Sequence, residues 1–235
     1  MKRDTVEPAT AEIVASIGKI TNTRTLELHF EMVTDGKAVG FGRTFLRPQG
    51  SGSYQYEAEI VYNLGEGARI EGWAKATLNA SLEPVEVEAR RELVAPNGNR
   101  KSTLRRAEIQ SNEVLVTLEE DGAPATQQIM PRPQSPFVFA LEFLVQRIDL
   151  ERFPAFSLRE FDVQDRAVKN QHFRVESGPN GIRRLVSRKD DGSIGYVFEV
   201  DAKGGLVSWA EPPLPVVSKT CSPERFEEMR KSMGR

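Results

Sequence analysis

Three side chains with acid–base and metal-binding chemistry, Glu27, His29 and Glu31, alternate with apolar residues near the start of the chain. In a strand, successive side chains point to opposite faces, so all three would share one face. Their tips could then bind a divalent cation or form a carboxylate–imidazole pair. The alternative, which we favour, is a solvated polar face, because three ligands from one strand leave much of a metal's coordination shell unfilled.

Basic residues form a second candidate site. Six of them gather around a hairpin predicted at Asn97-Gly98, and they are Arg90, Arg91, Arg100, Lys101, Arg105 and Arg106. A similar group comprises Arg183, Arg184 and Arg188. Guanidinium groups suit phosphate or carboxylate. Glutamates alternate with these arginines in the first group (Glu86, Glu88, Glu92 and Glu108), so cross-strand ion pairs are the favoured interpretation.

Catalytic and nucleotide-binding motifs with fixed spacing do not occur in the sequence. Gly40-Phe41-Gly42 and Gly50-Ser51-Gly52 lack the third glycine and the Lys-Ser/Thr pair that hold phosphate. There is no Gly-x-Ser-x-Gly, His-Glu-x-x-His or Cys-x-x-Cys motif. A Ser–His–acid set could still assemble from distant residues, so an enzyme remains a third hypothesis. We predict no catalytic residue, no metal and no cofactor.

Composition narrows the classes of partner. Lys and Arg total 32 and Asp and Glu total 34, so the formal charge of −2 provides no overall attraction to nucleic acid. Cys221 is the single cysteine, which excludes an intrachain disulfide. The two histidines, His29 and His172, are too few for a histidine-rich zinc site. No apolar run is long enough for a transmembrane helix.

Period-two alternation, interrupted by turn dipeptides, dominates the 235 residues. Leu26 to Met32 alternate apolar and polar before Asp35-Gly36, a hairpin signal because tight turns need positive φ. Tyr54 to Tyr62 alternate in the same way. Further strands are predicted in these segments: 39–46, 70–78, 85–93, 104–109, 114–118, 156–163, 171–176, 182–187, 194–200 and 206–209. This pattern predicts a mainly β protein, an antiparallel meander forming a curved sheet or half-barrel.

The apolar run from Phe137 to Ile148 breaks the alternation. Ser135-Pro136 before it suits an N-cap and first helical turn, so we predict a buried central helix near 136–148. A buried strand is the competing interpretation, since Phe and Val also favour sheets. Ser222-Pro223 opens a second, short C-terminal helix.

Aromatic residues are concentrated on the predicted inward faces and in the central helix. They are Tyr54, Tyr56, Tyr62, Phe137, Phe139, Phe143, Tyr196 and Phe198. They could simply fill the core. A curved sheet with this lining and a covering helix could also bind an apolar ligand, and we name these eight as candidate ligand-binding residues.

The order of these parts resembles bacterial half-barrel proteins related to the outer-membrane lipoprotein carriers, and envelope proteins of unknown function with that fold. The similar features are the meander opening near Tyr54-Gln55-Tyr56-Glu57-Ala58, the interrupting helix, and the returning strands that close near 200–207 and 214–216. The resemblance covers most of residues 21 to 218. It implies an incomplete barrel that binds acyl chains or another apolar partner.

We therefore expect three regions: an N-terminal segment 1–20, one antiparallel β domain 21–218, and a C-terminal helical tail 219–235. A division into two β halves joined by the central helix remains an alternative. The expected function is a non-enzymatic carrier or binding domain for an apolar, lipid-like molecule. The alternative is a protein-interaction or structural module with a packed core and no ligand cavity. No nucleic-acid partner is expected.

The sequence leaves the location open. The first eight residues lack the apolar stretch of a signal peptide. A periplasmic or cell-envelope location would therefore require an export signal that was removed ahead of Met1. Without such a signal, the protein would be cytoplasmic.

Overall fold

A computed structural model describes residues 10–17, 24–49, 52–133 and 136–233. The described residues form one antiparallel sheet of 14 strands, and the antiparallel meander agrees with the alternation of the sequence. The strands are β1 (Leu26–Thr34), β2 (Lys37–Pro48), β3 (Tyr54–Gly65), β4 (Ala68–Leu78), β5 (Pro84–Val94), β6 (Arg100–Ile109), β7 (Glu113–Glu120), β8 (Thr126–Pro131), β9 (Ala155–Asp162), β10 (Ala167–Ser177), β11 (Arg183–Arg188), β12 (Ile194–Val200), β13 (Leu206–Ala210) and β14 (Val217–Cys221). The described helices are α1 (Thr10–Ile17), α2 (Leu141–Leu144) and α3 (Pro223–Ser232), with short 3-10 turns at Val145–Arg147 and Pro179–Gly181.

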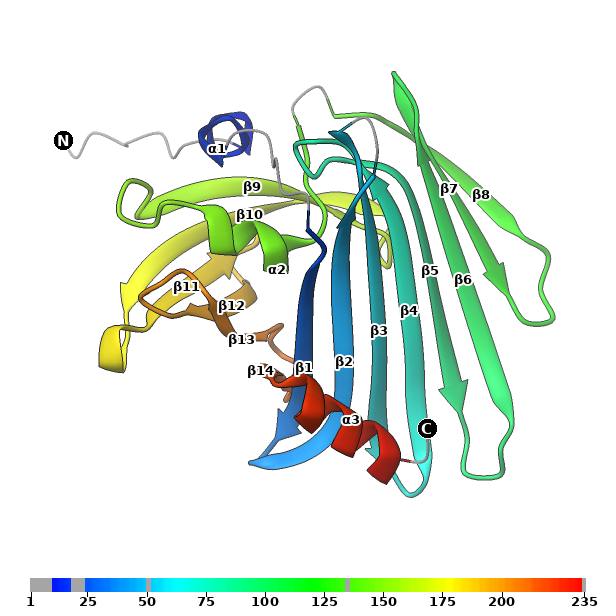
Figure 1. The fold of residues 1–235 in the computed structure, drawn as a ribbon. Helices are drawn as coiled ribbons and strands as arrows, with labels where there is room; N and C mark the ends of the chain where they lie inside the picture. Colours follow the sequence, from blue (N-terminus) through cyan, green and yellow to red (C-terminus); the bar gives the residue numbers. More distant parts are fainter. Residues whose placement is uncertain (1–9, 18–23, 50–51, 134–135, 234–235) are drawn as a thin grey trace.

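The sheet consists of two meanders joined in its middle. Its order is β8-β7-β6-β5-β4-β3-β2-β1-β14-β13-β12-β11-β10-β9. The first and last strands pair with each other, with Phe30 opposite Thr220 and Met32 opposite Ser218. Figure 1 shows that the second meander folds back over one end of the first, and that α2 lies between them. The mainly β, curved-sheet architecture is therefore confirmed.

Local turn chemistry explains the hairpins. At the β1–β2 turn, Asp35 and Gly36 have φ of 50° and 75°, as a type I′ turn requires. This turn matches the right-handed twist of the flanking strands, so it fixes which residues pair.

The central helix is shorter than predicted. In place of a helix near 136–148, α2 spans Leu141–Leu144 and continues as the 3-10 turn Val145–Arg147. Ala140 has a left-handed φ of 58°, so the helix cannot extend backward through it. Before it, Val138 forms a parallel bridge with Glu160 of β9, so the strand interpretation holds for this part. Ser135, the predicted N-cap, lies outside the described residues.

Two strands and one helix were not predicted. The alternation predicts neither β8 nor β14, and β14 crosses the expected boundary between residues 218 and 219. Helix α1 falls in the N-terminal segment 1–20, for which the sequence pattern predicts no helix. The C-terminal helix is confirmed as α3. The Ser222 hydroxyl caps it by accepting a hydrogen bond from the Arg225 N–H at 3.3 Å.

Candidate functional site

Strand register defines the two faces of the sheet. The Tyr56 hydroxyl donates a hydrogen bond to Glu142 of α2 at 2.9 Å, so Tyr56 lies on the face that α2 covers, which we call the inner face. Residues directly opposite one another in neighbouring strands share a face, so the register extends this assignment across the sheet. Tyr56 thus shares a row with Ala76, Val87, Ala107 and Val116.

The part of the inner face beneath α2 is a packed core. Most of the eight candidate aromatic residues lie in it or against it. The structure buries Tyr54, Tyr56, Phe137, Phe143 and Phe198, and packs Phe139 and Tyr196 against the same cluster. Tyr56 makes edge-on contacts with Phe139 and Phe143 at ring-centre distances of 5.3 and 6.4 Å. Tyr62, the eighth, is half-buried and lies outside the described hydrophobic clusters.

Two buried carboxyl groups, which the sequence analysis missed, pair with candidate tyrosines. Glu142 accepts a hydrogen bond from the Tyr56 hydroxyl. Burial raises the pKa of both groups. Burial raises the pKa of Glu160 to about 8, although hydrogen bonds from Tyr196 (3.0 Å) and Gln171 (3.2 Å) favour its charged form. Burial also raises the pKa of Tyr196. The sequence contains one signal for the buried position of Glu160: it follows Leu158 by two residues, so in a strand both side chains would point to the same, inward face.

Further from α2, the inner face carries apolar side chains that are not part of the packed core. One row runs Tyr62, Ile70, Leu93 and Lys101 across β3 to β6. The next runs Ile60, Gly72, Arg91 and Thr103. Leu93 is 42% exposed. None of the apolar side chains in these two rows belongs to either described hydrophobic cluster. We call these two rows the open inner face.

Charged side chains border the open inner face. Arg105 lies two residues from Thr103 on β6, and its buried Nε has no hydrogen-bond partner in the described structure. The hydrogen bond from Lys169 lowers the pKa of Asp165, in the β9–β10 turn, and the positive charge of Arg105 adds to this shift. The β9–β10 turn therefore lies close enough to β6 for Asp165 and Arg105 to interact electrostatically.

The Glu27, His29 and Glu31 cluster lies on the outer face and is covered by α3. His29 Nε2 is 2.9 Å from Glu27 Oε1, and its ring lies 4.9 Å from that of Phe226. Glu31 pairs instead with Arg225 at 3.3 Å. The face is therefore a helix-docking surface rather than a fully solvated one. No group of three or more His, Cys, Asp or Glu among the described residues is arranged to hold a metal ion.

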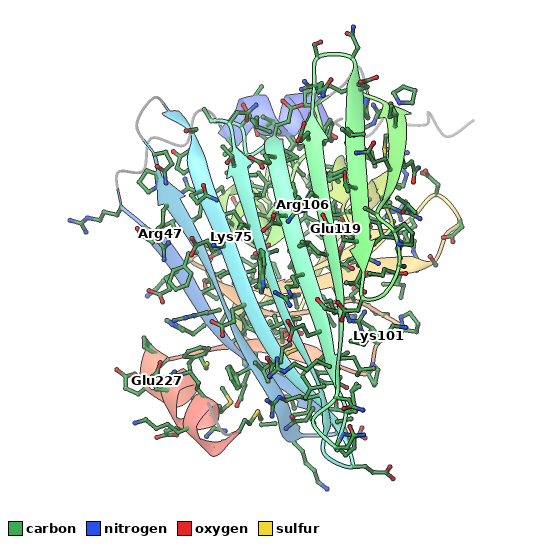
Figure 2. The ribbon with its side chains drawn as sticks, turned by 90° about the vertical axis from the view of Figure 1, so that its right-hand side faces the viewer. Arg47, Lys75, Lys101, Arg106, Glu119 and Glu227 are labelled. Atoms are coloured by element: carbon green, nitrogen blue, oxygen red, sulfur yellow. The ribbon has the colours of Figure 1, made fainter. Side chains whose placement is uncertain are left out.

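The basic hairpin divides between the two faces. On the outer face, Arg90 and Arg100 pair with Glu92 at 2.6 and 2.5 Å, and Arg106 pairs with Glu88 and Glu119. Figure 2 shows this charged surface, with Arg47, Lys75, Arg106 and Glu119 spread over it. The predicted ion pairing is therefore observed on the outer face. Arg91, Lys101 and Arg105 belong to the inner face.

A hollow of about 380 Å³ lies on the outer face and is lined by residues of β2 to β6. Phe45 and Trp73 line it together with charged residues that include Arg43 and Glu59. Arg43 and Glu59 already pair with each other at 2.9 Å, so we assign no ligand to this hollow.

Comparisons with known proteins indicate the fold alone. No family model and no curated protein sequence matches the chain. A solved structure, the β-barrel-like protein of the domain of unknown function DUF1849 from Brucella abortus, matches with a TM-score of 0.52 at 10% sequence identity. The match covers 85% of this chain and 96% of that one. It supports a β-barrel-like fold. None of the described helices has the length and apolar character needed to span a lipid bilayer.

Proposed function

We propose that this protein is a non-enzymatic binding domain for an apolar, lipid-like molecule, which lies on the open inner face. The observation that carries the proposal is the set of apolar side chains there, Ile60, Tyr62, Ile70 and Leu93, which lie outside both described hydrophobic clusters. When a ligand removes partly exposed apolar groups on an inward-facing surface from water, the free energy of the system decreases, which favours binding. The resemblance to lipoprotein carriers is consistent with this proposal.

The ligand position differs from the one expected around the central helix. The space beside α2 is filled by Phe137, Phe143 and Leu144, each at most 2% exposed. A ligand there would have to displace packed core, which costs several kcal/mol. Of the eight aromatic candidates, Tyr62 is best placed to contact a ligand on the open inner face, and the buried ones would support it from beneath α2.

Titration with the neutral fluorescent probe diphenylhexatriene tests the proposal. We expect saturable uptake by the wild-type protein and a loss of about fivefold or more in affinity for Leu93→Glu, because burying a charge beside an acyl chain is unfavourable. Leu214→Glu is the matched control, since Leu214 is 60% exposed in the connection between β13 and β14, away from this face. No uptake by the wild-type protein, or equal losses in both variants, would refute the proposal.

The edge strand β8 supports a second candidate, the protein-interaction module. The Arg132 N–H donates to the Asn112 carbonyl at 2.9 Å. Counting along the register from this bond, Gln127 and Ile129 direct their backbone groups away from β7. The opposite edge, β9, is instead capped: the Val138 N–H donates to Arg159 O at 2.7 Å, and Arg159 N–H donates to the Thr10 hydroxyl at 2.8 Å.

A strand from another protein could therefore add to β8, although Pro131, without an N–H, keeps the edge short. Selection of extended peptides on the wild-type protein, repeated on Gln127→Pro, tests this function. The substitution removes an outward N–H without breaking the β7–β8 ladder. Peptide binding that survives Gln127→Pro would exclude strand addition at this edge.

A further inference from the structure

Three cations surround one residue at the end of the open inner face. Thr103 of β6 lies directly opposite Arg91 of β5. Lys101 and Arg105 flank Thr103 at two residues on either side, so they share its face. Diagonal neighbours in a sheet lie about 7 Å apart, within reach of long side chains. The three positive groups can therefore converge above Thr103.

These inner cations differ from their outer neighbours. The adjacent Arg90, Arg100 and Arg106 each pair with a glutamate within 2.6 Å. For Arg91, Lys101 and Arg105 the described structure contains no ion pair, and the Arg105 Nε is buried without a hydrogen-bond partner. Arg91 and Lys101 are exposed.

Two carboxylates face this group. By register, Glu120 of β7 lies opposite Thr103. Asp165 interacts electrostatically with Arg105 across the inner face but hydrogen-bonds to Lys169. The three cations therefore exceed the facing carboxylates, and an anion would be attracted to them.

The apolar row leads directly to this positive group. Tyr62, Ile70 and Leu93 occupy successive strands, and the next position in the row is Lys101. At a strand spacing of about 4.8 Å, the row from β3 to β6 extends about 14 Å. An extended chain on this row would place its end group beside Lys101, Thr103 and Arg91.

We infer that the ligand of the open inner face is a single-chain amphiphile with an anionic oxygen headgroup, held by Arg91, Lys101 and Arg105. The acyl chain lies along Tyr62, Ile70 and Leu93. The inference rests on the proposed function and adds the headgroup chemistry. An amphiphile should bind more tightly than a free anion. Its chain would cover the apolar side chains beside the cations, whereas an inorganic ion would leave them in contact with water.

Four ligands with the same twelve-carbon chain test the headgroup: dodecanoate, dodecyl phosphate, dodecyltrimethylammonium and dodecyl glycerol. Calorimetry below their micelle concentrations should show the two anions binding at least about tenfold tighter than the cation and the neutral ether. The preference should shrink as salt is added, because exposed charges are screened. The preference for the anions should decrease in each of three variants, Arg91→Gln, Lys101→Gln and Arg105→Gln. The affinity for dodecyl glycerol should stay unchanged in all three.

Arg90→Gln and Arg106→Gln are matched controls from the same strands and should keep the preference. If Arg105→Gln fails to fold, as judged by circular dichroism, the exposed Arg91 and Lys101 still test the inference. Equal binding of all four ligands would overturn the headgroup inference and leave the proposed function standing. No binding of any of them would overturn both. Complete displacement of dodecyl phosphate by inorganic phosphate would identify a free-anion site and overturn the amphiphile.

Discussion

The Tyr196 hydroxyl donates a hydrogen bond to Glu160 at 3.0 Å and joins β12 to β9 over a sequence separation of 36 residues. Gln171 of β10 donates to the same carboxylate and accepts a hydrogen bond from the Ser187 hydroxyl of β11 at 2.9 Å. A polar network therefore ties together four neighbouring strands of the second meander. Such networks specify a single packing when each member is satisfied.

The unfolding free energy should decrease as pH rises from about 5 to 8. Burial raises the pKa of Glu160 to about 8, from 4.5 for an exposed glutamate. In this range the folded protein retains a proton that the unfolded chain has released, so raising the pH favours unfolding. One such group contributes a slope of at most about 1.4 kcal/mol per pH unit. Urea denaturation at several pH values measures it.

Glu160→Gln should flatten this slope, because the amide cannot ionise and can still accept the Tyr196 hydrogen bond. Glu142 and Glu211, whose pKa values are also raised by burial, would leave a smaller slope in the same direction. Glu151→Gln is the control, since its side chain is 80% exposed. An unchanged slope in Glu160→Gln would show that Glu160 does not hold the proton.

Removing the Phe226 ring should detach α3 from the outer face. Phe226 is 1% exposed and makes an edge contact with Phe41 at 5.4 Å and a tilted one with His29 at 4.9 Å. Phe226→Ala should lower the unfolding free energy by about 3 kcal/mol. Glu228→Ala, at a 70% exposed side chain of the same helix, should change it by less than about 0.5 kcal/mol. A loss below 1 kcal/mol for Phe226→Ala would contradict the docking.

Local signals predicted most of the strands. Alternation between Tyr54 and Tyr62, or between Ile194 and Val200, needs only neighbouring residues to reveal which face is buried. The sequence does not predict β8, because this edge strand is exposed on both faces at Gln127, Gln128 and Ile129. Its sequence therefore shows no alternation of apolar and polar residues. β14 is a five-residue strand with Ser218, Lys219 and Thr220 at its centre, and its position depends on pairing with β1.

Long-range geometry determined the rest of the candidate site. The sequence identified the inward tyrosines, but the partners Glu142 and Glu160 depend on how the second meander folds across the first. The six basic residues looked alike in sequence. Only the register separates Arg106, paired on the outer face, from Arg105, directed inward. Ion pairing was therefore predictable for part of this group, and the inner cations were not.

The Thr10 hydroxyl should protect the β9 edge. It accepts a hydrogen bond from the Arg159 N–H at 2.8 Å, and Thr10 is 4% exposed. Thr10→Val preserves the shape but removes this acceptor, so we expect a loss of about 1–2 kcal/mol in the unfolding free energy and faster hydrogen exchange of the Arg159 amide. Thr10→Ser keeps the hydroxyl and should retain the protection. Equal exchange in Thr10→Val and the wild-type protein would show that the edge is protected by other contacts.

Gly42 permits the Phe30 ring to lie against β2. A Cβ added at Gly42 would lie 2.4 Å from the Phe30 Cζ and 2.7 Å from the Glu59 carbonyl oxygen, closer than packed atoms approach. Gly42→Ala should therefore lower the unfolding free energy by about 1–3 kcal/mol, measured by urea denaturation. Gly72→Ala should cost less, because its added Cβ meets the flexible Ile60 side chain at 3.0 Å. In Gly42→Ala, a further Phe30→Leu should recover part of the loss. A Gly42→Ala protein as stable as the wild type would mean that the ring does not occupy this position in solution.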